Sequence, residues 1–223
     1  MERTIKVTGK GKLSVKPDTI RLIMTIEGMQ DEYDMAVAQS AAMTEEVKDL
    51  FVKLGFERDE VKTLSFNVTT QYESYQAKDR SWKRRLEGYK FTHRMKVEFA
   101  VDNKRLGKVL YALGHAVAHP EFHIEYTVAE PENCKNELLA DAIRDSKAKA
   151  DALTKAAGVI LGNIVTIDYS WAELELVSRP VEQFMLAESC VRCSEDEGNA
   201  YNIDVNPDNI EVADNVTVVW EIK

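Results

Sequence analysis

The stretch EPENCKNELLADAIRDSKAKADALTKAAG, residues 130–158, decides how the rest of this chain is interpreted. Apolar or small side chains recur in it in steps of four and three, the spacing of one helical face: Leu139, Ile143, Ser146, Ala150, Leu153 and Ala157. Pro131 suits the first turn of a helix, and Gly158 suits the residue just past its end. Because this face consists largely of small residues, we expect the helix to lie close against a flat partner, and the partner is a sheet, since most of the remaining chain has strand patterning.

Length and composition describe an ordinary globular protein. The chain has 223 residues, of which 44% are hydrophobic and 30% charged, so it can bury a substantial core. Its 29 basic and 38 acidic residues give a net charge of −9, which argues against a general polyanion binder. Residues 1–13, MERTIKVTGKGKL, lack the apolar core of a signal peptide, and no run approaches the roughly 18 apolar residues of a membrane span. We therefore expect no membrane span and a cytoplasmic location, or a periplasmic one if a signal peptide has been removed.

The remaining chain alternates between strand and helix patterns. Strands are expected at residues 4–15, 19–27, 64–72, 89–101, 122–128, 165–171 and 210–222, and helices at residues 31–54, 103–114 and 130–158. Gly9 and Gly11 in the first strand predict a bulge or bend. The stripe of the first long helix is Ala36, Val37, Ser40, Met43, Val47, Leu50, Phe51 and Leu54. Strand-helix-strand units recur at residues 19–72 and 89–129, so the chain is predicted to be one α+β domain over residues 1–223, with antiparallel sheets, helices packed on one face and two β-α-β pseudo-repeats.

The third and fourth strands form a long hairpin. Leu64, Phe66 and Val68 alternate with polar residues, as do apolar residues of the returning strand, so a single buried face is expected. Each arm is about 15 residues, or about 50 Å, against a usual strand of about five or six residues. Residues 72–88 are therefore predicted to project from the body.

The tip of this hairpin interleaves aromatic and basic side chains: Tyr72, Tyr75, Arg80, Trp82, Lys83, Arg84 and Arg85. Such a surface could stack on a nucleic acid strand or another anion, or it could anchor a protein contact. We favour contact with another copy, because the chain also carries an acidic segment, residues 173–209, with Glu182, Glu188, Glu195, Asp196, Glu197, Asp204 and Asp208. A contact from tip to acidic segment is head-to-tail and can close into a ring, so a homo-oligomer is expected and nucleic acid is the less favoured partner.

Other motifs give weaker hypotheses. Cys190 and Cys193 form a C-x-x-C, which makes a thiol redox protein an alternative, although the helical context of a redox motif and the second pair of a zinc site are missing. The cluster of His115, His119 and His123 is better explained by a solvated strand face than by a metal site. The glycine–lysine run at residues 9–12 lacks the helix of a phosphate loop. No spaced catalytic set is recognisable, so we expect no enzyme activity and no cofactor or metal.

An ordered set of short motifs resembles the SIMPL-domain family, also called the YggE-like or periplasmic-immunogen family. The set is Val7-Thr8-Gly9-Lys10-Gly11, Lys16-Pro17-Asp18, Gly55-Phe56, Val61-Lys62-Thr63, Gly88-Tyr89, the helix through Ala142, Ala148, Ala150 and Ala156 to Gly158 and Leu161-Gly162, and Ile210-Glu211-Val212 to Val218-Val219-Trp220. The resemblance implies an α+β fold and homo-oligomers, sometimes ring-like. It also implies links to oxidative-stress tolerance in bacteria and to a signalling-adaptor role in animal relatives. Many bacterial members are exported, and no catalytic residues come with the family.

The working hypothesis is a non-enzymatic, self-assembling protein that is related to stress and acts through oligomer or partner contacts. The alternatives are a binding module for anions or nucleic acid that uses the hairpin tip, and a thiol redox protein that uses Cys190 and Cys193.

Overall fold

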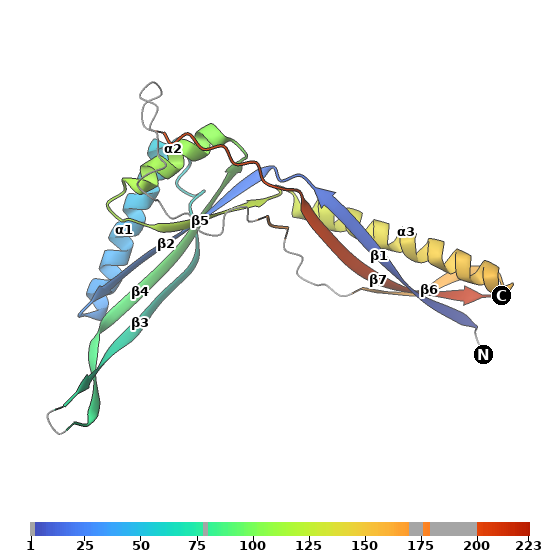
Figure 1. Cartoon of the computed structure of the whole chain (residues 1–223), viewed down its shortest axis with the longest axis horizontal. Helices are drawn as coiled ribbons and strands as arrows, with labels where there is room; N and C mark the ends of the chain where they lie inside the picture. The colour runs from blue at the N-terminus through green and yellow to red at the C-terminus, as the bar shows by residue number, and fades with distance from the viewer. Residues whose placement is uncertain (1–2, 78–79, 170–175, 179–199) are drawn as a thin grey trace. The chain divides into compact units, whose positions relative to one another are not determined.

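The computed structural model describes residues 3–77, 80–169, 176–178 and 200–223 (Figure 1). Within them, three helices and two sheets follow one another in the order that the sequence predicts, which confirms an α+β fold with antiparallel sheets. The chain divides into two compact units. Unit 1 comprises residues 1–18, 126–178 and 207–223, and unit 2 comprises residues 19–125 and 179–206. No helix in the described part is long and apolar enough to cross a membrane.

Unit 1 contains a sheet of strand order β1-β7-β6, built from β1 (Thr4–Val15), β7 (Ile210–Ile222) and β6 (Leu161–Tyr169). Helix α3 (Pro131–Ala157) lies along one face of it (Figure 1). A bulge at Gly9 and Gly11, one of the two predicted alternatives, is not found, because β1 pairs with β7 in unbroken register. The glycines instead admit the helix: a Cβ on Gly9 would lie 1.9 Å from the Ala142 carbonyl oxygen.

The face that α3 turns to the sheet is displaced from the predicted one. The buried residues follow one another in steps of four: Leu138, Ala142, Ser146, Ala150 and Thr154. The prediction shares only Ser146 and Ala150 with them, and Leu153 is exposed. The displacement arises because the two glycines of β1 bring the helix backbone close, and small side chains occupy the line of contact. The predicted ends are confirmed, with Pro131 in the first turn and Gly158 left-handed at φ 69°.

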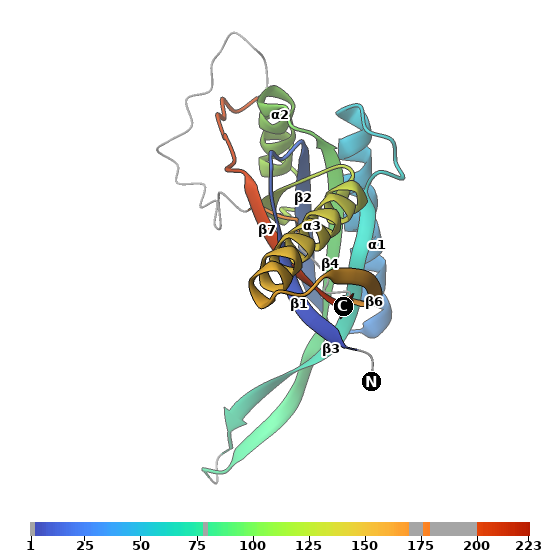
Figure 2. The same ribbon diagram turned by 90° about the vertical axis from the view of Figure 1, so that its right-hand side faces the viewer.

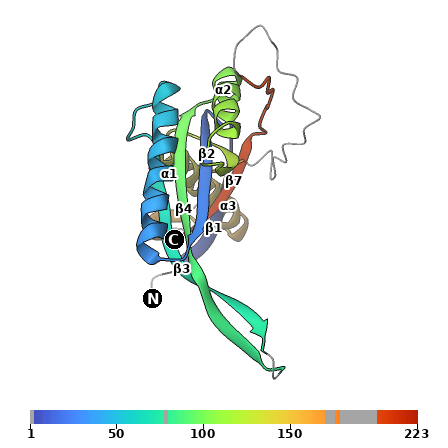
Figure 3. The ribbon, with the colours of Figure 1, turned by 90° about the vertical axis from the view of Figure 1, so that its left-hand side faces the viewer.

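Unit 2 contains a sheet of strand order β3-β4-β2-β5. Its elements are β2 (Thr19–Gln30), α1 (Tyr33–Lys53), β3 (Lys62–Gln76), β4 (Trp82–Ala100), α2 (Asn103–Gly114) and β5 (Glu121–Thr127), the last two residues of which belong to unit 1. Helix α1 packs on β2 and β4 (Figures 2 and 3). Its buried residues are Ala36, Ser40, Thr44, Val47 and Phe51, four of which were predicted. Thr44 was not predicted, and the other predicted residues of the stripe are half-buried: Val37, Met43, Leu50 and Leu54.

The buried face of the hairpin is confirmed for β4 and wrong for β3. Phe91, Met95, Val97 and Phe99 of β4 are buried, but Leu64 and Phe66 of β3 are exposed. The difference arises because β3 is the edge strand, and α1 is centred on β2 and β4. Sequence alternation shows which residues share a face, but it does not show whether a helix covers that face.

Candidate interaction surface

The distal part of the hairpin is a two-stranded ribbon. Strand β2 ends at Gln30, which pairs with Tyr89, and beyond this pair only β3 and β4 pair with each other. We call residues 72–76 and 82–88 the ribbon; it extends past the first turn of α1 (Figures 2 and 3). Gly88 marks its base, because a Cβ there would lie 2.6 Å from the Gln30 carbonyl oxygen. Only glycine fits where β4 passes the end of β2.

The strand register divides the predicted surface between the two faces of the ribbon. Tyr72 pairs with Leu86, Ser74 with Arg84 and Gln76 with Trp82, so one face, which we call the tryptophan face, carries Tyr72, Trp82, Arg84 and Leu86. The opposite face carries Glu73, Tyr75, Lys83 and Arg85. Arg80 lies in the connecting turn in a left-handed conformation, at φ 63°. The tip residues are therefore close in the chain, but they do not form one continuous surface.

The tryptophan face exposes large apolar side chains. Trp82 is 72% exposed, Tyr72 49% and Leu86 45%. The guanidinium carbon of Arg84 lies 4.8 Å from the centre of the Tyr72 ring, a cation–π distance. Tryptophan, tyrosine and arginine are the side chains that most often anchor protein interfaces. Leu86 was not among the predicted tip residues, although it follows Arg84 by two positions and Trp82 by four, the spacing of residues that share one face of a strand.

The opposite face neutralises part of its own charge. Arg85 donates through Nε and Nη2 to one carboxylate oxygen of Glu73, at 3.0 and 2.8 Å. Its guanidinium carbon also lies 6.0 Å from the centre of the Tyr75 ring. Lys83 is the other cation of this face. Because Arg85 is already held by a carboxylate, the ribbon presents fewer free cations than its composition suggests.

Several predicted residues lie outside the described part of the chain. They are Cys190, Cys193, Glu182, Glu188, Glu195, Asp196 and Glu197. Of the remaining acidic residues of the 173–209 segment named above, Asp204 is exposed in unit 2, where its carboxylate accepts a hydrogen bond from Asn103 Nδ2 at 3.3 Å. Asp208 is exposed in unit 1. Cys134, the one described cysteine, is half-buried and free, and burial raises the pKa of its thiol.

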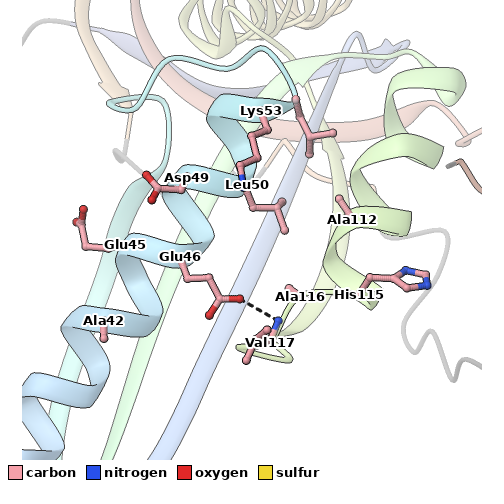
Figure 4. Close-up of a pocket in the computed structure, with 11 residues that line it drawn as sticks. Ala42, Glu45, Glu46, Asp49, Leu50, Lys53, Ala112, His115, Ala116 and Val117 are labelled. Atoms are coloured by element: carbon pink, nitrogen blue, oxygen red, sulfur yellow. Dashed lines mark hydrogen bonds between the residues drawn. The ribbon is translucent and has the colours of Figure 1, made fainter. Parts of the chain in front are cut away.

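A pocket of about 590 Å³ lies between α1 and α2 (Figure 4). Glu46 is one of its lining residues, and its carboxylate accepts hydrogen bonds from the backbone N–H groups of Val117 at 2.9 Å and Ala118 at 3.3 Å. Asp49 accepts from Arg58 at 2.5 Å. His115 is held by the Tyr111 carbonyl oxygen, 2.8 Å from its Nδ1, and Figure 4 shows its ring turned away from Glu46. Glu46, Asp49 and His115 thus hold local structure together, and the residues that line the pocket include no nucleophile with a base beside it.

The histidine cluster does not come together as a site. His115 follows α2, His119 has a left-handed φ of 41°, and His123 lies on β5 with its Nε2 3.8 Å from Glu125. Within residues that the structure describes, no group of three or more metal-ligating side chains is found.

The polar groups of unit 2 with shifted pKa values are structural. His93 Nδ1 lies 2.9 Å from Thr44 Oγ1, and its Nε2 lies 2.9 Å from Thr63 Oγ1. Burial, together with the charge of Lys48, lowers the pKa of His93. On the face of the sheet away from α1, burial acts to raise the pKa of Glu98, but hydrogen bonds from Arg21 and Lys96 outweigh it and lower that pKa. These groups hold strands and helix together.

Comparison with known proteins identifies the chain's relatives. The family model SIMPL, described as a protein of unknown function (DUF541), matches residues 5–220 and so spans both units. The chain is also 27% identical over 225 residues to the "26 kDa periplasmic immunogenic protein" of Brucella melitensis biotype 1, an alignment that covers 98% of this chain and 84% of that protein. Because the family model covers nearly the whole chain, this protein belongs to the SIMPL family.

Proposed function

We propose that this protein is a non-enzymatic, self-assembling member of the SIMPL family in which the ribbon contacts another copy. The observation that carries the proposal is the tryptophan face, where three large apolar side chains are exposed beside Arg84. Exposed aromatic side chains beside an arginine are typical anchors of an interaction site. The ribbon holds it away from α1, which leaves both strands accessible to a partner.

Charge supports another copy as the partner of the ribbon. The chain carries a net charge of −9, whereas Lys83, Arg84 and Arg85 follow one another on the ribbon. Acidic residues of a neighbouring copy, Asp204 among them, would complement Arg84 on the tryptophan face and Lys83 on the opposite face, whereas Arg85 already pairs with Glu73. A nucleic acid would be repelled by the rest of the surface. A contact from the ribbon to a different surface is heterologous, so it closes into a ring or continues as a filament.

The test is the native mass of a ribbon variant, measured by light scattering. The triple variant Trp82→Ala, Arg84→Glu, Arg85→Glu removes the aromatic anchor and reverses two charges, so its native mass is expected to fall below that of the parent. The control is Lys104→Glu with Lys108→Glu, which reverses two charges on exposed residues of α2 in the same unit and should leave the mass unchanged. An unchanged mass for the ribbon variant would contradict the proposal.

Salt provides a second measurement of the same contact. Exposed charges separated by more than about 8 Å are largely screened at about 0.15 M ionic strength, so a charged contact weakens as salt is added. The assembly of the parent should loosen across a salt series. If the ribbon instead binds an anion, single-stranded nucleic acid at low salt should bind to the parent and not to the triple variant. A thiol redox role predicts a reversible disulfide between Cys190 and Cys193, which would appear as a mass difference between oxidised and reduced protein.

Location and biological role are proposed from the relatives. The Brucella relative is named as a periplasmic protein, which supports a periplasmic location for this chain, and the family resemblance supports a stress-related role in bacteria. We also propose that residues 1–223 act as one family domain, since the family model spans both units. Cell fractionation would test the location, and survival of a deletion strain under oxidant would test the role.

A further inference from the structure

Strand β3 presents an open edge along the four-stranded sheet. It pairs with β4 on one side, and among the described residues it has no strand on the other. Its fifteen residues, KTLSFNVTTQYESYQ, contain only two charged side chains, Lys62 and Glu73, and neither proline nor glycine. An edge strand of this length and composition is a template for another strand, so natural proteins protect such edges or pair them.

The other sheet edges are protected. At the free edge of β1, the backbone N–H groups of Lys10 and Lys12 donate to Asp145 at 2.7 Å and to Asp141 at 3.2 Å, two carboxylates of α3. Strand β6 contains two register shifts, and only its last four residues, 166–169, pair regularly. Strand β5 has seven residues and is bridged by Ser178. The pairing of β3 also contains two register shifts, but they leave a longer regular run of seven residues, 65–71, and among the described residues no carboxylate or bridging segment is found at its outer edge.

We propose that β3 pairs antiparallel with β3 of a second copy, about a two-fold axis at Val68; this deepens the proposed self-assembly and rests on it. Register shifts between Thr63 and Ser65 and between Gln71 and Tyr72 bound a regular run, residues 65–71. Val68 is the centre of that run, so pairing about it uses the whole run in both copies. The interface is isologous, in contrast to the heterologous contact of the ribbon.

The strand is self-complementary in this register. The run of residues 65–71 contains no charged side chain, and antiparallel pairing brings the Lys62 end of one copy beside the Glu73 end of the other. Phe66, which is exposed in the single chain, would stand opposite Thr70 of the second copy. Cross-strand pairs of aromatic and β-branched side chains stabilise sheets, and the outward backbone groups of both edges gain partners.

The experiment is disulfide trapping in full-length protein with Cys134, Cys190 and Cys193 replaced by serine. Val68→Cys places two thiols directly opposite each other, so mild oxidation should give a covalent dimer. Phe66→Cys by itself should give no covalent dimer. Position 66 of one copy lies four residues along the paired strands from position 66 of the other, about 13 Å, and a disulfide spans at most roughly 7 Å between Cα atoms. A mixture of Phe66→Cys and Thr70→Cys proteins should again give dimer.

The outcomes separate the two interfaces. A dimer from Val68→Cys and from the mixture, but not from Phe66→Cys, supports the edge pairing. No dimer from Val68→Cys, or equal dimer from Phe66→Cys, overturns it. The Val68→Cys dimer should still form when Trp82→Ala, Arg84→Glu and Arg85→Glu are added. If the dimer forms and the native mass of the ribbon variant is reduced, both contacts are supported. If the dimer forms and the native mass is unchanged, only the ribbon contact is overturned. With the native cysteines retained, Asn67→Lys should lower the native mass by placing like charges beside the axis, and an unchanged mass would count against the pairing.

Discussion

Gly9→Ala should destabilise unit 1 far more than its single added methyl group suggests. The new Cβ would lie 1.9 Å from the Ala142 carbonyl oxygen and 2.5 Å from the Ser146 backbone nitrogen. Both obstacles are helix backbone, which no side-chain rotation can move. Helix α3 must therefore withdraw from β1.

The size of the withdrawal sets the expected loss. Ordinary contact begins at 3.4 Å, so the helix must retreat by about 1.5 Å, and a gap of about 1 Å already forfeits up to about half of a dispersion contact. Overpacking of a core costs about 1–3 kcal/mol, and this case belongs at the upper end. Replacing glycine also restricts the unfolded chain, which offsets about 0.4–1 kcal/mol. We expect a net loss of about 2–3 kcal/mol in the free energy of unfolding, or about 4–12 °C in melting temperature for a chain of this length.

Urea unfolding followed by tryptophan fluorescence measures this loss, because Trp220 is buried in the same cluster as Ala142. Parent and variant are compared at one protomer concentration, since assembly would otherwise shift the midpoint. The control is Gly114→Ala in α2, where the nearest atom is the Tyr201 hydroxyl at 3.2 Å, the far end of a side chain. A Gly9→Ala protein within about 0.5 kcal/mol of the parent, the usual range for surface changes, would refute the close packing of α3 on β1.

Two further predictions concern ionisable groups of unit 2. Because the pKa of His93 is lowered in the folded protein, its contribution to stability is complete above the unfolded pKa near 6.5 and is lost as pH falls from there through the folded pKa. His93→Gln should therefore make the urea midpoint depend less on pH across that interval. An unchanged dependence on pH would show that His93 is not the group responsible. Arg21→Met removes the guanidinium that lies 3.6 Å from the buried Glu125 carboxylate, so it should cost about 3 kcal/mol in the free energy of unfolding at pH 7. A loss in urea unfolding within about 0.5 kcal/mol, the usual range for surface changes, would contradict that assignment.

The order of elements was readable from the sequence because local patterning determines it. Alternation identified all seven strands, the ends of α3 followed from Pro131 and Gly158, and four of the five buried residues of α1 were in the predicted stripe. The motifs carried by β1, α3 and β7 also indicated the SIMPL family, which the family model bears out. Each of these signals depends on residues near one another in the chain.

The tertiary structure decided what packs against what. The reason for Gly9 and Gly11 lies in Ala142 and Leu138, more than a hundred residues away in the chain. The sequence therefore suggested a bulge or bend, where the structure shows close contact with a helix. Leu64 and Phe66 alternate like core residues, yet they are exposed because β3 is the edge of its sheet. The ribbon residues appear as one cluster in the chain, and only the register of β3 on β4 separates Trp82 and Tyr72 from Tyr75 and Arg85. Periodicity fixes which side chains share a face, whereas burial depends on strand order and on which helix covers that face, and these are set by contacts between distant parts of the chain.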